Sequence, residues 1–549
     1  MTENGLHNEE RGRLGIVVSG SLTRGLEVKL DSAASVEDIA VGRYVTIEGE
    51  KGRFFGMITD VTLDAIDPRL MVTPPDVTDP FIAEVLSGTS TFGRLHVLPL
   101  LTIGGDALSL LEGPQPVKTV PAHFSVVREA SQQDVELVFG REDERQFYIG
   151  TPLDMETKVC LNLAEFAKRS NGIFGKSGTG KTFLTRILLI GMVQKNVAVN
   201  LIFDMHSEYG WEGTSEEGRK VKALKQLFPS KMAVFALDEE NARRRKVSTD
   251  FVVEIGYDSI EPEDIEMLRE TLGLTEAAVQ VPYRLARHYG EGKWLEGFLA
   301  VEGREQINEL ASSLGEHEAT LAALRRRLEA LRRLRFLVPH ARDNPIQRIL
   351  EYLDRGINVV LEFGRYTDFT AYVLVANLLT RRIHALYRER MERAMGEDIA
   401  KPRPLVITIE EAHKFLSPQV ATQTIFGTIA REMRKYHVTL LVIDQRPSGI
   451  DEEVMSQIGT KITCLLDNER DIESVLTGVS GKSELKAVLA KLETRQQALI
   501  FGHAVPMPVV VRTREYGSPQ SYKELAPMGS GEAIELKKKA EEEGEDLWG

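Results

Sequence analysis

The chain has 549 residues, which is more than a single hydrophobic core usually organises, so we expect two or three domains. Its net charge of −14 disfavours a protein that coats nucleic acid, although a local basic channel is compatible with it. Two cysteines, Cys160 and Cys464, argue against a disulfide scaffold and fit a reducing compartment. The polar N-terminus and the lack of a long apolar run predict a cytoplasmic protein without membrane contact.

Short β-branched and aromatic runs, separated by Gly, Asp and Ser, fill the first part of the chain. These runs occupy residues 14–21, 25–30, 43–50, 53–63, 93–103 and 134–140. So many short strands in one segment predict a small β-barrel domain over residues 1–150.

Farther along, apolar strands alternate with helical stretches, which predicts an α/β fold with a parallel sheet. The strands are near-continuous apolar runs, as expected for strands that are covered on both faces. They end at Gly175, Asp204, Phe363, Glu411, Gln445 and Asp467. We expect this α/β core to occupy residues 151–257 and 346–515.

Between the two core segments, residues 258–345 carry helical signals in place of strands, which predicts a helical insertion. Leucines and one histidine recur alternately four and three residues apart, a heptad stripe that Gly315 either interrupts or leaves intact. The stripe comprises Leu310, Leu314, His317, Leu321, Leu324, Leu328 and Leu331. The charged tail, residues 516–549, is predicted to be a frayed helix or disordered.

The run GKSGTGKT matches the phosphate-binding motif G-x-x-x-x-G-K-[ST], with an apolar strand before it and a helical pattern after it. It comprises Gly175, Lys176, Ser177, Gly178, Thr179, Gly180, Lys181 and Thr182. The glycines let backbone N–H groups surround phosphate, Lys181 reaches the β- and γ-phosphates, and Thr182 binds Mg²⁺. This context disfavours a chance Gly/Ser loop and predicts ATP and Mg²⁺ as cofactors.

A second buried strand, LVITIEE, ends in two adjacent glutamates at the edge where ligands bind in such sheets. We interpret Glu410 as the metal-site acid and Glu411 as the base that orients the attacking water. An ordinary acidic strand end is the alternative. His413 and His206 lack the spacing of metal ligands, and we expect His413 to pack or hydrogen-bond at a helix start.

Polar residues also end two other buried strands. Gln445 is placed to sense the γ-phosphate, although the following Pro447, Ser448 and Gly449 also signal a turn. Asp204 is placed to hydrogen-bond near the magnesium or the attacking water, with a turn role as the alternative.

These motifs occur in an order that resembles HerA, a DNA-translocating ATPase of the FtsK–HerA branch of RecA-like motors. The matching segments are GIFGKSGTGKT, FDMHSEYG, ITIEEAH, REMRKYHV and DQRPSG, and the resemblance extends from about Gly12 to Arg514. EEAH followed by QRPS is specific for this branch, because most P-loop proteins have Asp in the first acidic position. The resemblance implies a RecA-like core preceded by the barrel that HerA proteins carry.

The resemblance further implies a homohexameric ring that passes double-stranded DNA through its pore. Family members commonly act with the nuclease NurA in DNA-end processing and repair, whereas some bacterial relatives pair with other effectors in phage defence. We therefore keep two hypotheses: a translocase and helicase that feeds a nuclease, and a ring that scaffolds an effector. A conjugation pump is disfavoured because such pumps usually carry membrane segments.

Three arginines match family positions that act on the nucleotide. Arg431 and Arg434 match the segment that supplies a finger to the neighbouring subunit, and which of them is the finger stays open. A solvated helix pair is the alternative. Arg169 matches an arginine that acts within its own subunit, although Lys168 beside it makes a surface charge nearly as plausible a reading.

DNA contacts are not assignable to particular residues from the sequence. Basic clusters occur at residues 242–246, 324–336 and 380–393, and each also fits a solvated helix or loop. Sequence-specific readout is not expected, because no recognition-helix or zinc motif is present.

Overall fold

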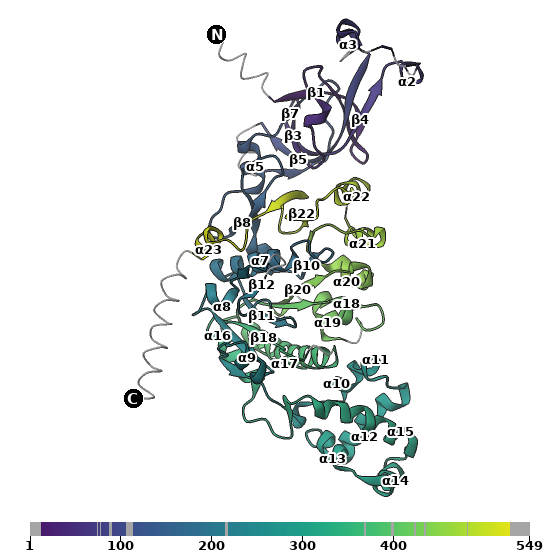
Figure 1. Ribbon diagram of the computed structural model, residues 1–549, viewed down its shortest axis with the longest axis vertical. Helices are drawn as coiled ribbons and strands as arrows, with labels where there is room; N and C mark the ends of the chain where they lie inside the picture. The colour runs from purple at the N-terminus through teal and green to yellow at the C-terminus, as the bar shows by residue number, and fades with distance from the viewer. Residues whose placement is uncertain are drawn as a thin grey trace, which may run out of the picture.

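The computed structural model describes residues 12–526, except 68, 74, 77, 87–89, 106–112, 215–217, 367–368, 397–399, 422–423, 433–434 and 480. The molecule is elongated, with the N-terminal barrel and the helical insertion at opposite ends and the large sheet between them (Figure 1). Of the charged tail that we predicted at residues 516–549, residues 527–549 lie outside the described residues. The first part of that segment is ordered and contains helix α23 (Pro519–Leu525), on which Leu525 is buried.

The N-terminal domain is a closed barrel of six strands in the order β2-β1-β7-β3-β4-β5, with the β2–β5 pairing as the closure. A short strand, β6 (Gln115–Pro116), extends it beside β5. The barrel strands are β1 (Arg13–Ser21), β2 (Gly25–Leu30), β3 (Tyr44–Glu48), β4 (Gly52–Ala65), β5 (Thr91–Gly104) and β7 (Val126–Glu129). Alternate residues such as Val28, Ile47 and Val97 fill its interior. The predicted barrel is confirmed.

One of the predicted strands, residues 134–140, is wrong. These residues belong to helix α5 (Gln132–Phe139), which begins with a capping box. The Ser131 hydroxyl accepts the Asp134 N–H, and the Asp134 carboxylate accepts the Ser131 N–H. Gly140, with φ of +73°, ends the helix. These capping signals outweigh the β-branched composition that suggested a strand.

The central domain contains a sheet of twelve strands in the order β15-β14-β18-β11-β19-β20-β10-β21-β22-β23-β8-β9. The first eight strands run parallel and form the predicted α/β core, whereas the last four add an antiparallel extension that the sequence did not predict. The parallel strands are β15 (Phe251–Val252), β14 (Met232–Ala236), β18 (Asn358–Glu362), β11 (Val199–Asp204), β19 (Leu405–Glu410), β20 (Val438–Asp444), β10 (Asn171–Phe174) and β21 (Thr460–Thr463).

The antiparallel strands are β22 (Gln497–Gly502), β23 (Val509–Thr513), β8 (Gln146–Thr151) and β9 (Val159–Asn162). Because β8 begins at Gln146, the sheet starts inside the segment 1–150 that we placed in the barrel domain. The two ends of the core therefore meet in one sheet, since β23 pairs with β8.

The insertion is helical, as predicted. It contains α10 (Pro262–Met267), α11 (Arg269–Leu272), α12 (Glu276–Tyr289), α13 (Trp294–Ala300), α14 (Gly303–Leu314) and α15 (Glu318–Leu328). Gly315 adopts a φ of +66° and ends α14, so it interrupts the heptad stripe and lets α15 fold back. Ion pairs fasten the insertion to the long helix α17 (Phe369–Gly396), where Arg381 contacts Asp264 at 2.9 Å.

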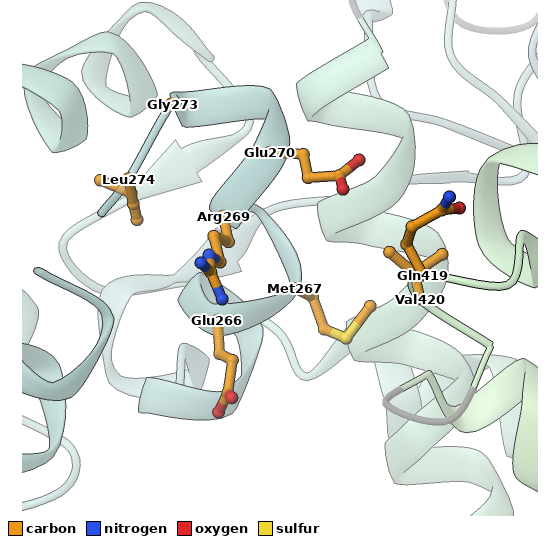
Figure 2. Close-up of a pocket in the computed structure, with 8 residues that line it drawn as sticks. All are labelled: Glu266, Met267, Arg269, Glu270, Gly273, Leu274, Gln419 and Val420. Atoms are coloured by element: carbon orange, nitrogen blue, oxygen red, sulfur yellow. The ribbon is translucent and has the colours of Figure 1, made fainter. Parts of the chain in front are cut away.

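A hollow of about 390 Å³ lies where the insertion faces the core. Figure 2 shows Met267 and Glu270, from α10 and α11, on one side and Gln419 and Val420 on the other. The last two residues follow α18 (His413–Leu416), in the connection that leads away from Glu411. The insertion therefore lies next to the segment that follows the predicted catalytic glutamate.

Candidate active site

The GKSGTGKT run forms a loop between β10 and helix α7 (Lys181–Lys195), in the strand–loop–helix order that the motif requires. Gly175, Gly178 and Gly180 have φ values of +154°, +77° and +92°, a region that favours glycine. A Cβ atom on Gly175 would lie 2.8 Å from the Cβ of Cys464, so this position also lacks room for a side chain. The N-terminus of α7 therefore faces a concave loop suited to an anion.

Two side chains at the start of α7 point into this loop. The Lys181 ammonium donates to the carbonyl oxygen of Lys176 at 2.7 Å, and burial lowers the pKa of Lys181. The Thr182 hydroxyl donates to Oε2 of Glu208 at 2.9 Å. The cation and the hydroxyl are thus held where the motif places phosphate and metal.

A cavity of about 800 Å³ lies over the loop at the carboxyl edge of the parallel strands. Its polar wall includes Ser177 through Thr182, Glu208, Glu410, Glu411, Asp444 and Gln445. Its other wall includes Arg495, Gln496 and the segment 513–519. The structure thus brings most of the predicted site residues, from three separate segments of the chain, to one cavity.

One group of polar residues, here called the β11 cluster, comprises Thr182, Asp204, Glu208, Tyr209 and Glu410. The buried Asp204 carboxylate accepts the N–H groups of Glu208 and Tyr209, both at 2.8 Å, and of Gly210 at 3.3 Å. Burial raises the pKa of Asp204. Asp204 does not line the cavity, and it shapes the turn that carries Glu208 and Tyr209.

Glu410 lies at the end of β19, and its Oε1 accepts the hydroxyl of Tyr209 at 3.0 Å. Its Oε2 is buried and has no hydrogen-bond partner among the residues that the structure describes. Burial and the nearby carboxylates of Asp204 and Glu208 raise the pKa of Glu410 well above its ordinary value. An unsatisfied carboxylate oxygen in such an acidic place fits a hard divalent cation such as Mg²⁺.

A second group, here called the β20 cluster, comprises Glu411, His413, Asp444 and Gln445. The Gln445 amide donates to Oε1 of Glu411 at 3.2 Å. The buried Asp444 carboxylate accepts the backbone N–H groups of His413 and Arg446, both at 2.6 Å, and lies 2.9 Å from the His413 ring Nδ1. Asp444 thereby holds the loop after β19, which carries Glu411, and the loop after β20, which carries Gln445, and these two side chains contact each other.

Two features of the β20 cluster concern its backbone and its histidine. Glu411 adopts a φ of +49°, an uncommon conformation for a residue other than glycine and one often found at functional sites. Nδ1 of His413 lies 3.7 Å from Oε2 of Glu411. Potential ligand atoms of Glu411, His413 and Asp444 lie within 4.8 Å of one another, and the contacts to Asp444 account for this proximity without an ion.

Arg169 and Arg431 do not line the cavity. Arg169 precedes β10, at the opposite end of that strand from the phosphate loop, and its side chain packs over Gly459. Arg431 lies in α19 (Ile425–Glu432), with its Nε 3.4 Å from Oε2 of Glu453. Arg434 lies outside the described residues. A role for Arg431 or Arg434 in a neighbouring subunit stays a prediction.

Sequence reasoning missed several residues of the site. Glu208 and Tyr209 lie within the FDMHSEYG segment, where we assigned a role to Asp204 alone. Arg186 lies 5.6 Å from the ring centroids of both Phe183 and Tyr516 and donates to the carbonyl oxygen of Glu208. The sequence around Tyr516 gives no local signal, because the antiparallel extension of the sheet brings it to the cavity.

The three basic clusters form many ion pairs within the chain. In the first, Arg243 and Arg244 pair with glutamates one helical turn away, and Arg245 pairs with Glu362. The second and third clusters contain the pairs Arg332–Glu329, Arg381–Asp264, Arg390–Asp354 and Arg393–Glu389. These contacts are consistent with structural roles and do not mark a DNA path. Within the described part of the chain, no helix is long and apolar enough to cross a membrane.

Comparison with known proteins agrees with this site. A family model described as "Helicase HerA, central domain" matches residues 147–383, from β8 into α17. The DNA double-strand break repair helicase HerA of Saccharolobus solfataricus is 23% identical over 484 residues, which cover 86% of this chain and 87% of that protein. The HerA helicase of Sulfurisphaera tokodaii is 24% identical over 541 residues, or 92% and 93% of the two chains.

Among solved structures, the chain is similar to the bacterial conjugative coupling protein TrwBΔN70, with a TM-score of 0.47 and 12% identity over 71% of this chain and 93% of that one. It is also similar to VirB4 of Thermoanaerobacter pseudethanolicus, with a TM-score of 0.45 and 13% identity over 70% and 100% of the two chains. With the phosphate loop, the paired glutamates and Gln445 in one cavity, the match to the HerA central domain and the similarity to HerA helicases support a HerA-type ATPase.

Proposed function

We propose that this ATPase is a translocase and helicase of double-stranded DNA that works as a homohexameric ring with a NurA-type nuclease in DNA-end processing and repair. The observation that carries this proposal is the convergence of the phosphate loop, Glu410, Glu411 and Gln445 on one cavity. It is supported by relatives that are named double-strand break repair helicases and align with most of the chain.

We assign roles in ATP hydrolysis to the phosphate loop and to the polar residues at the ends of β19 and β20. Backbone N–H groups of the loop and the Lys181 ammonium bind the β- and γ-phosphates. Thr182 and Glu410 would hold Mg²⁺, which neutralises charge on the phosphates. Glu411 accepts a proton from the attacking water, and the Gln445 amide, 3.2 Å from Glu411, senses the γ-phosphate.

Assembly into a ring would complete this site. In ring motors a neighbouring subunit inserts an arginine at the γ-phosphate, and we assign this role to Arg431 or Arg434. Arg431 lies outside its own subunit's cavity, as such a residue must. Hydrolysis should therefore depend on assembly as well as on the residues of one cavity.

Docking of a nuclease or another effector is supported by an apolar surface on the barrel. Strands β4 and β5 continue into an extension that carries α2 (Arg69–Val72) and α3 (Pro80–Leu86) away from the large sheet (Figure 1). Its exposed apolar side chains are Leu63, Ile66, Val72, Phe81 and Val85, of which Val72 is 84% exposed. Exposed apolar side chains gathered in one segment are typical of a protein interface.

The function can be tested by measuring ATP hydrolysis of the purified chain with and without double-stranded DNA, together with the mass of the native assembly. We expect a hexamer whose hydrolysis rises with DNA. Lys181→Ala should weaken ATP binding about a hundredfold or more, because the buried ammonium that faces the phosphates is lost. Lys195→Ala, at the other end of α7, is the control. A monomer that neither binds DNA nor responds to it would refute the translocase proposal.

A further inference from the structure

The turn after β11 carries two side chains, Glu208 and Tyr209, that contact different residues of the expected magnesium site. We propose that Glu208 is a further residue of the magnesium site: it accepts the Thr182 hydroxyl hydrogen and thereby sets how strongly Thr182 binds the ion. This inference rests on the proposed use of Mg²⁺ with ATP, and it adds a residue from the turn after β11 to a site otherwise built from the phosphate loop and β19.

The backbone of the turn is held before any ligand arrives. Asp204 accepts three consecutive N–H groups, those of residues 208–210, and Ser207 has a φ of +57°. The guanidinium of Arg186, itself buried, donates to the carbonyl oxygen of Glu208. These contacts fix the position from which the Glu208 side chain extends into the cavity.

The two side chains of the turn engage different halves of the expected metal site. Tyr209 donates to Oε1 of Glu410 at 3.0 Å, whereas Glu208 accepts from Thr182 at 2.9 Å. The Thr182 hydroxyl has one hydrogen, and Glu208 rather than Glu410 receives it. Glu410, at the end of β19, therefore accepts from Tyr209, whereas Thr182 pairs with Glu208 from the turn.

This pairing suits metal binding chemically. A hydroxyl that donates its hydrogen keeps two lone pairs on oxygen for a cation. A hydrogen bond to a carboxylate is charge-assisted and increases electron density on the donor oxygen. Hydrogen-bond partners of metal ligands tune affinity in this way, and their loss typically weakens metal binding 10- to 100-fold.

The charge of the Glu208 carboxylate should have the opposite effect on nucleotide affinity when Mg²⁺ is absent. Glu208 adds a negative charge beside the place where the triphosphate binds, and it adds to the charge around Glu410, whose Oε2 has no partner among the described residues. Removing that charge should strengthen the binding of metal-free nucleotide and weaken the binding of the magnesium–nucleotide complex. If Glu208 had only a structural role, its substitution would weaken both kinds of binding.

The test is a magnesium titration of nucleotide binding by Glu208→Gln, followed with a fluorescent ATP analogue in the full-length protein. Gln keeps the length of the side chain and an acceptor oxygen, but it removes the charge. We expect the half-saturating Mg²⁺ concentration to rise about tenfold, while affinity in EDTA stays equal or becomes tighter. Glu212→Gln, which changes an exposed glutamate paired with Lys220 near the same turn, should behave as wild type.

Each contrary outcome is distinct. An unchanged magnesium midpoint in Glu208→Gln, or an equal loss of affinity with and without Mg²⁺, would overturn the inference. If the wild type itself bound nucleotide independently of Mg²⁺, the proposed use of Mg²⁺ would fail, and this inference with it. Glu208→Asp, which keeps the charge but shortens the reach to Thr182, should give an intermediate midpoint and provides the reading if the Gln variant unfolds.

Discussion

The β11 and β20 clusters are built on the same plan but used differently. Each depends on a buried aspartate at the end of a parallel strand, Asp204 in one and Asp444 in the other, that accepts backbone N–H groups. Asp204 holds the turn that follows its own strand, whereas Asp444 joins the loop after β20 to the loop after β19. One aspartate therefore shapes a local turn, and the other aligns two distant segments.

The two clusters therefore position different side chains. The turn held by Asp204 delivers Glu208 to Thr182 and Tyr209 to Glu410, and we propose that the β11 cluster serves magnesium-dependent binding. The loops joined by Asp444 bring Glu411 and Gln445 together, and we propose that the β20 cluster serves the attack of water. In this proposal the strand-end aspartates position the backbone, and residues near them act on the nucleotide.

The largest effect is expected at Glu411. Glu411→Gln removes the proposed base but keeps an amide of the same shape, so turnover should fall by about 10²- to 10⁴-fold. ATP should still bind, because the phosphate loop and the β11 cluster are untouched. Steady-state hydrolysis and equilibrium binding measure the two quantities separately. Normal turnover would show that the base lies elsewhere, and Glu452→Gln, outside the cavity, serves as the control.

A stability effect is expected at Glu362, which ends β18 next to Asp204. Burial and Asp204 raise the pKa of this carboxyl group to about 7, although Arg245 contacts it at 2.9 Å. Because the folded pKa exceeds the ordinary value of 4.5, the contribution of Glu362 to stability is full below about pH 4.5 and is lost as pH rises through about 7. Ionisation of Glu362 near neutral pH therefore lowers the stability of the folded protein.

Glu362→Gln removes this titration. Relative to wild type, the variant should therefore gain stability between pH 5 and pH 8, by up to about 3 kcal/mol. Thermal or denaturant unfolding at several pH values measures the difference. A difference that does not change with pH would mean that Glu362 titrates normally in the folded protein.

A smaller effect separates the two aspartates. Asp444→Asn should lower turnover about tenfold, which corresponds to about 1.4 kcal/mol, because the loops that carry Glu411 and Gln445 lose a charged acceptor. Nucleotide affinity should change little. Asp204→Asn should instead shift the magnesium dependence of binding, since it loosens the turn that carries Glu208. If both variants changed the same quantity, the division between the clusters would be wrong.

Much of the fold and part of the site followed from local patterns. The phosphate loop and the two glutamates at the end of β19 lie on contiguous motifs, and strand-end position was enough to predict that they meet. The capping box of α5 was a local signal too, but the valines of the segment led us to predict a strand. Glu208 was missed because its role depends on a side-chain contact with Thr182 across 26 residues of chain. Tyr516 lies at the cavity because of the antiparallel extension of the sheet, which the hydrophobic pattern of the sequence did not predict.

The division between the clusters is tested most directly by Glu208→Gln, Glu411→Gln and the double variant, each measured for magnesium-dependent nucleotide affinity and for turnover at saturating Mg²⁺. If the two clusters act separately, the double variant should combine the magnesium midpoint of the first variant with the turnover of the second, and the free-energy effects of the two substitutions should add within about 0.5 kcal/mol. A shifted magnesium midpoint in Glu411→Gln, or a turnover of Glu208→Gln at saturating Mg²⁺ as low as that of Glu411→Gln, would contradict this separation.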